Sequence, residues 1–342
     1  MRRHHLFLMG VTLAVAGCAQ DAVSPGVQAP SEEGASHVTY TVGTVTALQN
    51  AIKNALPGDV ILVQPGTYTG VKSTSGYSNA YFFSGKSGTS TARIILRSQD
   101  PANPAILQGS TTASGYVFYL TGDNWEVRDL KFQTASKGIM LDNANRNLLN
   151  NIEVSNIGEE GVHFRDGSSN NIIENSRVHH TGVVTDDYGE AIYVGSDNGK
   201  WSTYVKETDD NIVRNNILGP AVTAEHVDIK EGASRTILEY NTFHGDGITG
   251  ANSADSFVDA KGNNSIIRYN TGYRENDANV VDAFQVHAPV SGWGLNNDFH
   301  HNTVYMDNST PYVVAAPTGT ALVSANTRSP AGNMYKGHFT IY

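Results

Sequence analysis

Short runs of alternating apolar and polar residues recur along most of the chain, and most of them end in Asn. These runs occupy residues 172–175, 212–216, 237–241, 266–270 and 298–302. Between them lies a second set of six-residue segments that align with one another without gaps. These segments begin at residues 137, 160, 190, 225, 256, 282 and 311. Such short alternating runs are typical of half-buried β-strands, and their return along the chain indicates a repeat architecture.

A single coil of two or three short strands cannot bury its own apolar face, but a stack of coils buries a continuous core. The repeats therefore predict an all-β fold, a right-handed parallel β-helix in which each strand pairs with its equivalent one coil later. The recurring Asn fits this fold, because Asn tolerates the left-handed backbone of a bend and its amide can bond to equivalent amides above and below. A β-propeller is the alternative, but it requires a more constant period than this chain has.

One helix is expected before the first coils. Thr46 is its predicted N-cap, with Gln49 placed to complete a capping box, and Thr44 is the alternative cap. Leu48 and Ile52 form its apolar face, and a Pro-Gly pair ends it. A helix in this place would cover the exposed strand edges at the end of the solenoid.

The N-terminal residues read as an export signal. A basic start and a short apolar run over residues 1–17 precede Cys18, an arrangement that resembles the signal of bacterial lipoproteins. The resemblance implies cleavage before Cys18, lipidation of its thiol and, because Ala19 follows, outer-membrane retention or surface exposure. An ordinary secretion signal with an incidental Cys is the alternative. We expect residues 18–37 to be a flexible tether and residues 38–342 to form the β-helix domain.

Composition limits what the chain can be. Only 16% of its 342 residues are charged, and the formal charge is −10, which disfavours a broad nucleic-acid surface. The single Cys excludes a disulfide scaffold, and any membrane contact is expected through the lipid anchor alone. We expect one solenoid rather than two domains, acting as a monomer.

Strand alternation predicts that polar side chains of the second set form columns on one outer face. The first column reads Met140, His163, Tyr193, Asp228, Asp259, Gln285 and Val314. The second column reads Asp142, Arg165, Gly195, Lys230, Lys261, His287 and Ala316. A third, where the strands start, reads Lys137, Glu160, Glu190, Glu225, Ser256 and Asp282. The end coils carry mostly apolar residues in these columns, so titratable groups gather over the middle coils. There they are close enough to shift one another's pKa.

At these residues the chain resembles the parallel β-helix polysaccharide lyases, above all the chondroitinase B/alginate lyase family. The resemblance covers most of residues 38–310 and implies a calcium-binding Glu followed five residues later by a catalytic Lys, which match Glu225 and Lys230. The chain departs from the family in two places. Lys261 stands where the family has Arg, and Thr223 where it has a second calcium-binding Glu.

The chemistry of uronate β-elimination suits these residue types. A base must remove the C5 proton, and Lys230 can do so if a neighbouring cation such as Lys261 or a metal lowers its pKa. The substrate carboxylate must also be neutralised. Arg165, Lys261 or Ca²⁺ held by Glu190 and Glu225 could supply that charge.

Further side chains are candidates for proton donation and for binding an acidic polysaccharide. His163, Tyr193, His226 and His287 could protonate the leaving O4 atom. Asp228, Asp259 and Gln285 would face substrate from the first column. In the longest loop, Trp201 and Tyr204 could stack on sugar rings, and Trp293 is a weaker candidate.

Two other functions fit the same surface. A glycoside hydrolase would need two carboxylates across the scissile bond, such as Asp228 with Asp259, or Glu190 with Asp228. A non-catalytic glycan-binding surface protein would use the same face without chemistry. The sequence alone leaves both open beside the lyase.

Overall fold

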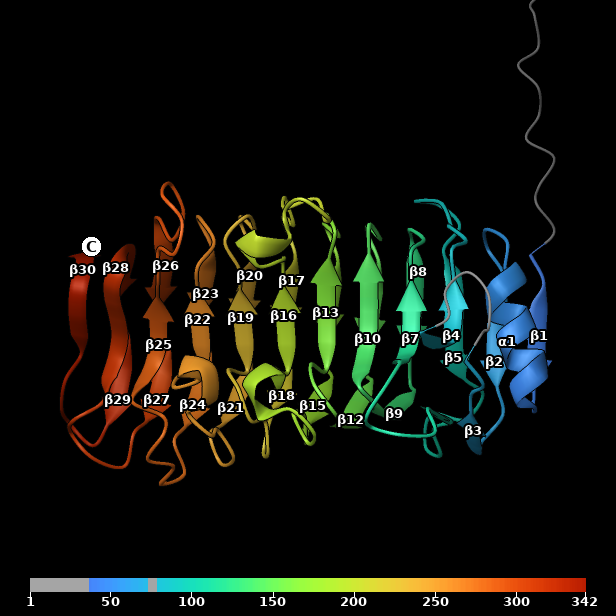
Figure 1. Ribbon diagram of the computed structural model, residues 1–342, viewed down its shortest axis with the longest axis horizontal. Helices are drawn as coiled ribbons and strands as arrows, with labels where there is room; N and C mark the ends of the chain where they lie inside the picture. Colours follow the sequence, from blue (N-terminus) through green and yellow to red (C-terminus); the bar gives the residue numbers. More distant parts are fainter. Residues whose placement is uncertain (1–36, 73–78) are drawn as a thin grey trace, which may run out of the picture. The chain divides into compact units, whose positions relative to one another are not determined.

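The computed structural model describes residues 37–72 and 79–342 and forms one stack of coils (Figure 1). Each coil contributes a strand to each of three faces, and the strands of neighbouring coils pair in parallel. This is the predicted right-handed parallel β-helix. The predicted signal, Cys18 and the tether up to residue 36 lie outside the described residues and stay predictions.

The strands of the solenoid group into three faces. The first face consists of β4 (Ala80–Ser84), β7 (Tyr116–Leu120), β10 (Lys137–Asp142), β13 (Val162–Arg165), β16 (Ile192–Val194), β19 (Val227–Ile229), β22 (Val258–Ala260), β25 (Asp282–Val286), β28 (Tyr312–Ser324) and β30 (Tyr335–Ile341). The second face consists of β1 (Thr39–Val42), β2 (Val60–Val63), β5 (Ile94–Ser98), β8 (Trp125–Arg128), β11 (Leu148–Asn150), β14 (Ile172–Glu174), β17 (Ile212–Arg214), β20 (Ile237–Glu239), β23 (Ile266–Arg268) and β26 (Asn297–His300). The C-terminal halves of β28 and β30 continue this second face beside β26. The third face is a ten-stranded sheet of β3 (Thr67–Thr69), β6 (Ile106–Gln108), β9 (Lys131–Ala135), β12 (Glu153–Ile157), β15 (Arg177–His179), β18 (Ile217–Leu218), β21 (Thr242–His244), β24 (Thr271–Tyr273), β27 (Thr303–Tyr305) and β29 (Thr327–Ser329).

The helix α1 (Val45–Asn54) begins two residues earlier than the capping box predicts. Its N-cap is Thr44, whose hydroxyl accepts the N–H of Ala47, so the prediction of Thr46 as cap is wrong and the alternative is right. Leu48 and Ile52 are fully buried, as expected, and α1 packs on β1, β2 and β4. None of the helices in the described part of the chain is long and apolar enough to cross a membrane.

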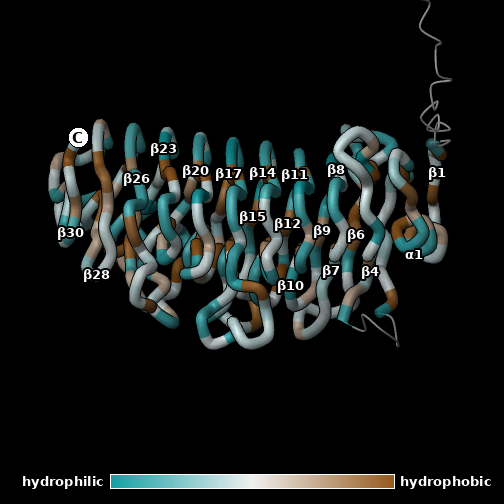
Figure 2. Tube along the Cα trace, turned by 90° about the horizontal axis from the view of Figure 1, so that it is seen from above, coloured by the Kyte–Doolittle hydropathy of each residue, from teal (hydrophilic) through white to brown (hydrophobic). Residues whose placement is uncertain are grey.

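Buried Asn side chains form a ladder through the interior. Each side-chain carbonyl accepts the backbone N–H of the preceding coil's Asn, and each amide group donates to its successor. The ladder runs through Asn216, Asn241, Asn270, Asn302 and Asn326. The left-handed backbone belongs to the residue before each of these, so one Asn does not do both tasks, as the sequence had suggested. The hydrophilic row of turns containing these bends is visible in Figure 2.

Strand register confirms the outward columns over the middle coils and corrects them at the last one. His163 lies opposite Tyr193, Tyr193 opposite Asp228, and Asp228 opposite Asp259. At β28, however, Ala315 lies opposite Gln285 and Val314 is buried opposite Phe284. The predicted alignment is one residue out there, and a slip of one residue exchanges the inner and outer faces of a strand.

Candidate active site

A cleft of about 1140 Å³ runs over the middle coils of the first face. Besides the strands, its walls include η1 (Asp186–Tyr188), the loop after β16 with η2 (Asn198–Lys200), and η3 (Ala251–Ser253). Most of the candidate residues line it. They are His163, Arg165, Glu190, Tyr193, Tyr204, Glu225, Asp228, Lys230, Asp259, Lys261 and His287.

The cleft has walls of opposite charge, because the outward columns run along the stack. Where the strands end, one wall carries Arg165, Lys200, Lys230, Lys261 and His287. Where the strands start, the other carries Glu159, Glu160, Glu190 and Glu225, together with Lys137, which pairs with Glu159 and Glu160. An acidic protein thus presents a row of cations that can meet the carboxylates of a polyanion.

Lys261 is held between two carboxylates. Its Nζ atom lies 2.9 Å from Asp228 Oδ1 and 2.8 Å from Asp259 Oδ2. Burial lowers the pKa of Lys261, but the attraction of Asp228, Asp259 and Glu225 outweighs it and raises that pKa well above its ordinary value. Lys261 is therefore a permanent cation, which can attract a carboxylate but cannot take a proton.

Lys230 is held less tightly than its neighbour. Its Nζ atom lies 3.5 Å from Asp228 Oδ2 and 3.9 Å from Asp197 Oδ2, both longer than a hydrogen bond. It also lies over the ring of Tyr193, 5.5 Å from the ring centre. Lys230 is consequently able to reorient toward a bound molecule at lower cost than Lys261.

The rings of Tyr193 and His163 pack against each other with their planes tilted by 53°. Their ring centres lie 4.3 Å apart. Burial, together with the charges of Asp228 and Glu190, raises the pKa of Tyr193 well above its ordinary value. Its phenol is thus a proton donor at every physiological pH.

His163 is a neutral donor to the backbone. Its Nε2 atom lies 2.9 Å from the carbonyl oxygen of Gly195, which fixes the proton on that nitrogen in the neutral ring. Burial lowers the pKa of His163, although Glu160 opposes this at 3.6 Å. Burial raises the pKa of Glu160, but the nearby His163 ring and the paired Lys137 ammonium outweigh burial, and that pKa falls to about 2.

Arg165 is fixed in one orientation by a carboxylate. Its Nε and NH2 atoms donate to the two oxygens of Asp142 at 2.7 and 2.6 Å, and the Tyr119 hydroxyl donates to the same carboxylate at 2.8 Å. The ring of Tyr204 lies 4.3 Å from the guanidinium carbon. Arg165 thus presents a rigid positive charge to the cleft, with Tyr204 beside it.

Three buried carboxylates meet at the centre of the acidic wall. Oxygens of Glu190, Glu225 and Asp228 all lie within 4.8 Å of one another. Burial, followed by repulsion from Glu160, Asp228 and Glu225, raises the pKa of Glu190 well above its ordinary value. Burial likewise raises the pKa of Glu225 to about 8, although Lys261 opposes the shift. The sequence had pointed to Glu190 and Glu225, and Asp228 completes the group.

Four candidates lie away from the cleft, and they are His226, Gln285, Trp201 and Trp293. His226 is fully buried between Phe243 and Phe257, and its Nε2 atom lies 2.8 Å from a backbone carbonyl oxygen, so it cannot touch substrate. His226 directly precedes β19 in the chain. Gln285 is 7% exposed and lies against Asp282 outside the cleft.

Trp201 also lies outside the cleft, and its prediction as a stacking residue for this site is wrong. Its indole N–H donates to the Ser196 carbonyl, and its ring packs edge-on against Trp293, with the Lys206 ammonium over both rings. This packing joins the loop after β16 to the loop after β25. Trp201 therefore supports the wall that Tyr204 lines.

Some cleft residues carried no signal in the sequence. Tyr188, Asp197 and Lys200 come from loops whose course depends on packing against other coils. Asn198, for example, donates its backbone and side-chain N–H groups to Glu231 at 2.8 and 2.7 Å, which fixes the start of its loop. Glu159 stands beside a predicted column and could have been found from its neighbour Glu160.

Known proteins support the fold and the class of enzyme. Residues 29–191 match the family described as the Pel9A-like, right handed beta helix region. Pectate lyase L of Dickeya chrysanthemi is 29% identical over 131 residues, which are 37% of this chain and 30% of the relative. The chain thus matches less than a third of that curated relative.

Two solved structures cover nearly the whole solenoid. The alginate lyase from Paenibacillus sp. str. FPU-7 is 50% identical, with a TM-score of 0.85 over 89% of this chain and 99% of its own. Pectate lyase Pel9A is 18% identical, with a TM-score of 0.57 over 88% and 79%, and is similar in fold alone. Identity of one half over a complete relative, on the same coils that carry the cleft, places this chain in the family of the Paenibacillus alginate lyase, among the parallel β-helix polysaccharide lyases.

Proposed function

We propose that this protein cleaves a uronate-containing polysaccharide by β-elimination, with Lys230 as the base. The contrast between the two lysines of the cleft carries this proposal. Lys261 is clamped by contacts of 2.8 and 2.9 Å and stays charged, whereas Lys230 has only contacts of 3.5 and 3.9 Å. The amine that is free to turn toward a C5 proton is therefore that of Lys230.

Tyr193 is the matching acid. Lys230 would take the C5 proton, and the electrons of the C5–H bond would form the C4=C5 double bond. The bond between C4 and O4 would break, and its electrons would leave with O4. The raised pKa of Tyr193 keeps its hydroxyl protonated, so the phenol can give its proton to the departing oxygen. The two groups lie close enough to serve one sugar ring, with Nζ 5.5 Å from the ring centre.

The substrate carboxylate must be neutralised before its neighbouring proton becomes acidic. Arg165 and Lys261 are fixed cations on the same wall as Lys230 and can bind that carboxylate. The acidic wall also fits a hard cation such as Ca²⁺, because three carboxylates converge there and Glu190 Oε2 is buried without a hydrogen-bond partner. Glu190, Glu225 and Asp228 would hold the ion, which when bound would neutralise a further carboxylate.

Alginate is the first substrate to test, because the relative that shares half of this sequence is an alginate lyase. Purified protein would be incubated with alginate, pectate, chondroitin and glucuronan, each with and without a chelator. We expect an ultraviolet-absorbing unsaturated product from at least one polymer. Cleavage without such a product would overturn the lyase. Activity lost to the chelator and restored by Ca²⁺ supports the metal site, and unchanged activity assigns neutralisation to Arg165 and Lys261.

A glycoside hydrolase is the second candidate, and one of its two proposed carboxylate pairs is favoured. Asp228 and Asp259 share Lys261, and the pKa of Asp259 is held well below its usual range by Lys261 and His287 despite burial, so this pair lacks an acid. Glu190, with its raised pKa, could serve as the acid, with Asp228 as the second carboxylate. The absence of an unsaturated product in the same assay would favour this pair.

We also propose that the protein acts outside the cell as a lipid-anchored monomer on an acidic polysaccharide. The support is the basic start, apolar run and Cys18 of the sequence. Such an anchor would hold the solenoid near polymers that are too large to enter the cell.

A further inference from the structure

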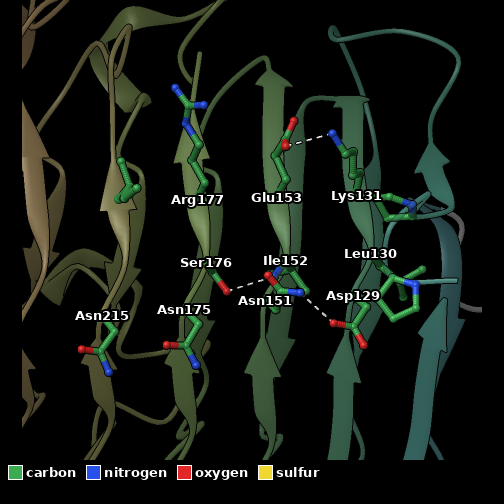
Figure 3. Close-up of a pocket in the computed structure, with 13 residues that line it drawn as sticks. Asp129, Leu130, Lys131, Asn151, Ile152, Glu153, Asn175, Ser176, Arg177 and Asn215 are labelled. Atoms are coloured by element: carbon green, nitrogen blue, oxygen red, sulfur yellow. Dashed lines mark hydrogen bonds and ion pairs between the residues drawn. The ribbon is translucent and has the colours of Figure 1, made fainter.

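A second groove lies on the edge of the solenoid between its second and third faces, which are the two faces that do not carry the cleft (Figure 3). Its volume is about 230 Å³, and its wall includes Pro101 and Pro104. Lys131 and Glu153, stacked on β9 and β12, form an ion pair of 3.0 Å. On β15, Arg177 is exposed, and no carboxylate of the described residues forms an ion pair with it. The groove has one more carboxylate, Asp129, which pairs with Arg128 at 2.9 Å, so the Arg177 guanidinium is the charged group of the described lining that has no ion pair.

Exposed Asn side chains repeat along this groove at the spacing of the coils. The amide of Asn151 donates to Asp129 Oδ1 at 2.7 Å and that of Asn175 to Asn150 Oδ1 at 3.0 Å, so each keeps its carbonyl oxygen and a second N–H for a ligand. Asn151, Asn175 and Asn215 take the left-handed conformation at the bend between the second and third faces, with φ of 51°, 53° and 56°. Neighbouring coils lie about 4.8 Å apart, a distance similar to the length of one pyranose residue. A sugar chain along the groove could thus place successive rings beside successive amides.

The row of amides ends at a stack of exposed aromatic rings. In the next coils the same bend position holds Tyr240 and Tyr269, with φ of 56° and 55°. Left-handed backbone is unfavourable for bulky residues, and such strain is characteristic of functional positions. The two rings are stacked, with centres 5.1 Å apart and planes within 5°, and their exposed fractions are 52% and 39%. One face of Tyr240 is covered by Tyr269, and the other is directed toward the coil of Asn215.

We propose that this edge is a second binding site for the acidic polysaccharide, formed by Arg177, the Asn amides and the ring of Tyr240. Ring faces, amides and a single cation are the groups that recognise an acidic sugar. The class of polymer rests on the proposed function. A chain held here leaves the cleft free, so the site would keep the enzyme on its polymer between cleavages and raise the local concentration of substrate.

The test is a double variant, Arg177→Ser with Tyr240→Asn. Asn is the residue that the same bend holds at positions 151, 175 and 215, so the backbone is not strained and the melting temperature should be unchanged or higher. The matched control, Arg146→Ser with Tyr342→Asn, removes the same groups from other exposed places. Binding is measured by retardation in gels that contain alginate, pectate, chondroitin or glucuronan.

We expect the double variant to bind the polymer about 10-fold more weakly than the control. Its KM on the polymer should rise, while kcat, and the activity on short oligosaccharides that span only the cleft, should not change. Retardation equal to that of the control overturns the second site. If the protein cleaves none of the polymers but its retardation still depends on Tyr240 and Arg177, the second site is upheld and the lyase is overturned. Retardation by none of the four polymers overturns the second site, and the ultraviolet assay then decides the lyase separately.

Discussion

The Nζ atom of Lys230 lies 5.5 Å from the centre of the Tyr193 ring, and this pair joins two neighbouring coils of the first face. A base and a protonated phenol so placed can act on the two sides of one C4–C5 bond. The predictions below follow from this pair and from the charges that surround it.

Replacing Lys230 by Ala should abolish cleavage while the fold persists. General base catalysis contributes a factor of about 10² to 10⁴, so the ultraviolet assay should show a loss of that size. Lys53→Ala, an exposed lysine of α1, is the control and should keep full activity. Wild-type activity in Lys230→Ala would show that another group takes the proton.

Tyr193→Phe removes the hydroxyl and keeps the ring that packs against His163. We expect kcat to fall by about 10² to 10⁴, with little change in KM or melting temperature. The stacking partner supplies the comparison, because His163→Phe should alter stability and leave the proton donor in place. If Tyr193→Phe keeps the wild-type kcat, the leaving oxygen takes its proton from elsewhere.

Lys261→Met should destabilise the protein strongly. Removal of the ammonium leaves Asp228 and Asp259 buried with unbalanced charge, a situation that typically costs about 3–5 kcal/mol. Lys230→Met should cost much less, because its contacts are longer. Urea denaturation of both variants measures the difference, and equal losses would contradict the description of Lys261 as a clamped cation.

Glu225 should make the metal-free protein less stable as the pH rises. Its pKa of about 8 in the folded state lies above the ordinary value, so the folded state binds more protons than the unfolded state between those two values. The stability contributed by this group is complete at low pH and is lost as the pH rises toward 8. In a chelator, Glu225→Gln should flatten this loss by a few kcal/mol, as thermal melts at pH 5 and pH 8.5 would reveal. Parallel pH profiles of variant and wild type would disprove the shift.

Cys18→Ala should release the protein from the membrane fraction. Labelling with a radioactive fatty acid in cells checks this, with the label expected on the wild type and absent from the variant. A labelled Cys18→Ala chain would place the lipid elsewhere, and an unlabelled wild type would favour an ordinary secretion signal.

Much of this molecule could be read from its sequence, because the side-chain direction of a strand alternates locally. The period of two placed His163, Tyr193, Asp228 and Asp259 in one column, and strand register confirms that column. The same rule failed at Val314, where β28 pairs one residue out of the expected alignment. The register between coils depends on the intervening turns, whose lengths vary. The alternation of side chains within one strand carries no information on that register.

The sequence by itself determined the solenoid, the helix at its start and the face on which titratable groups gather. Only the tertiary structure decided what each group can do there. It separated clamped Lys261 from loosely held Lys230, added Asp228 to the two glutamates, and buried His226 in the core. The reason is that charge, burial and pKa depend on neighbours one coil away, which are some 22 to 40 residues distant in the sequence but about 4.8 Å distant in space.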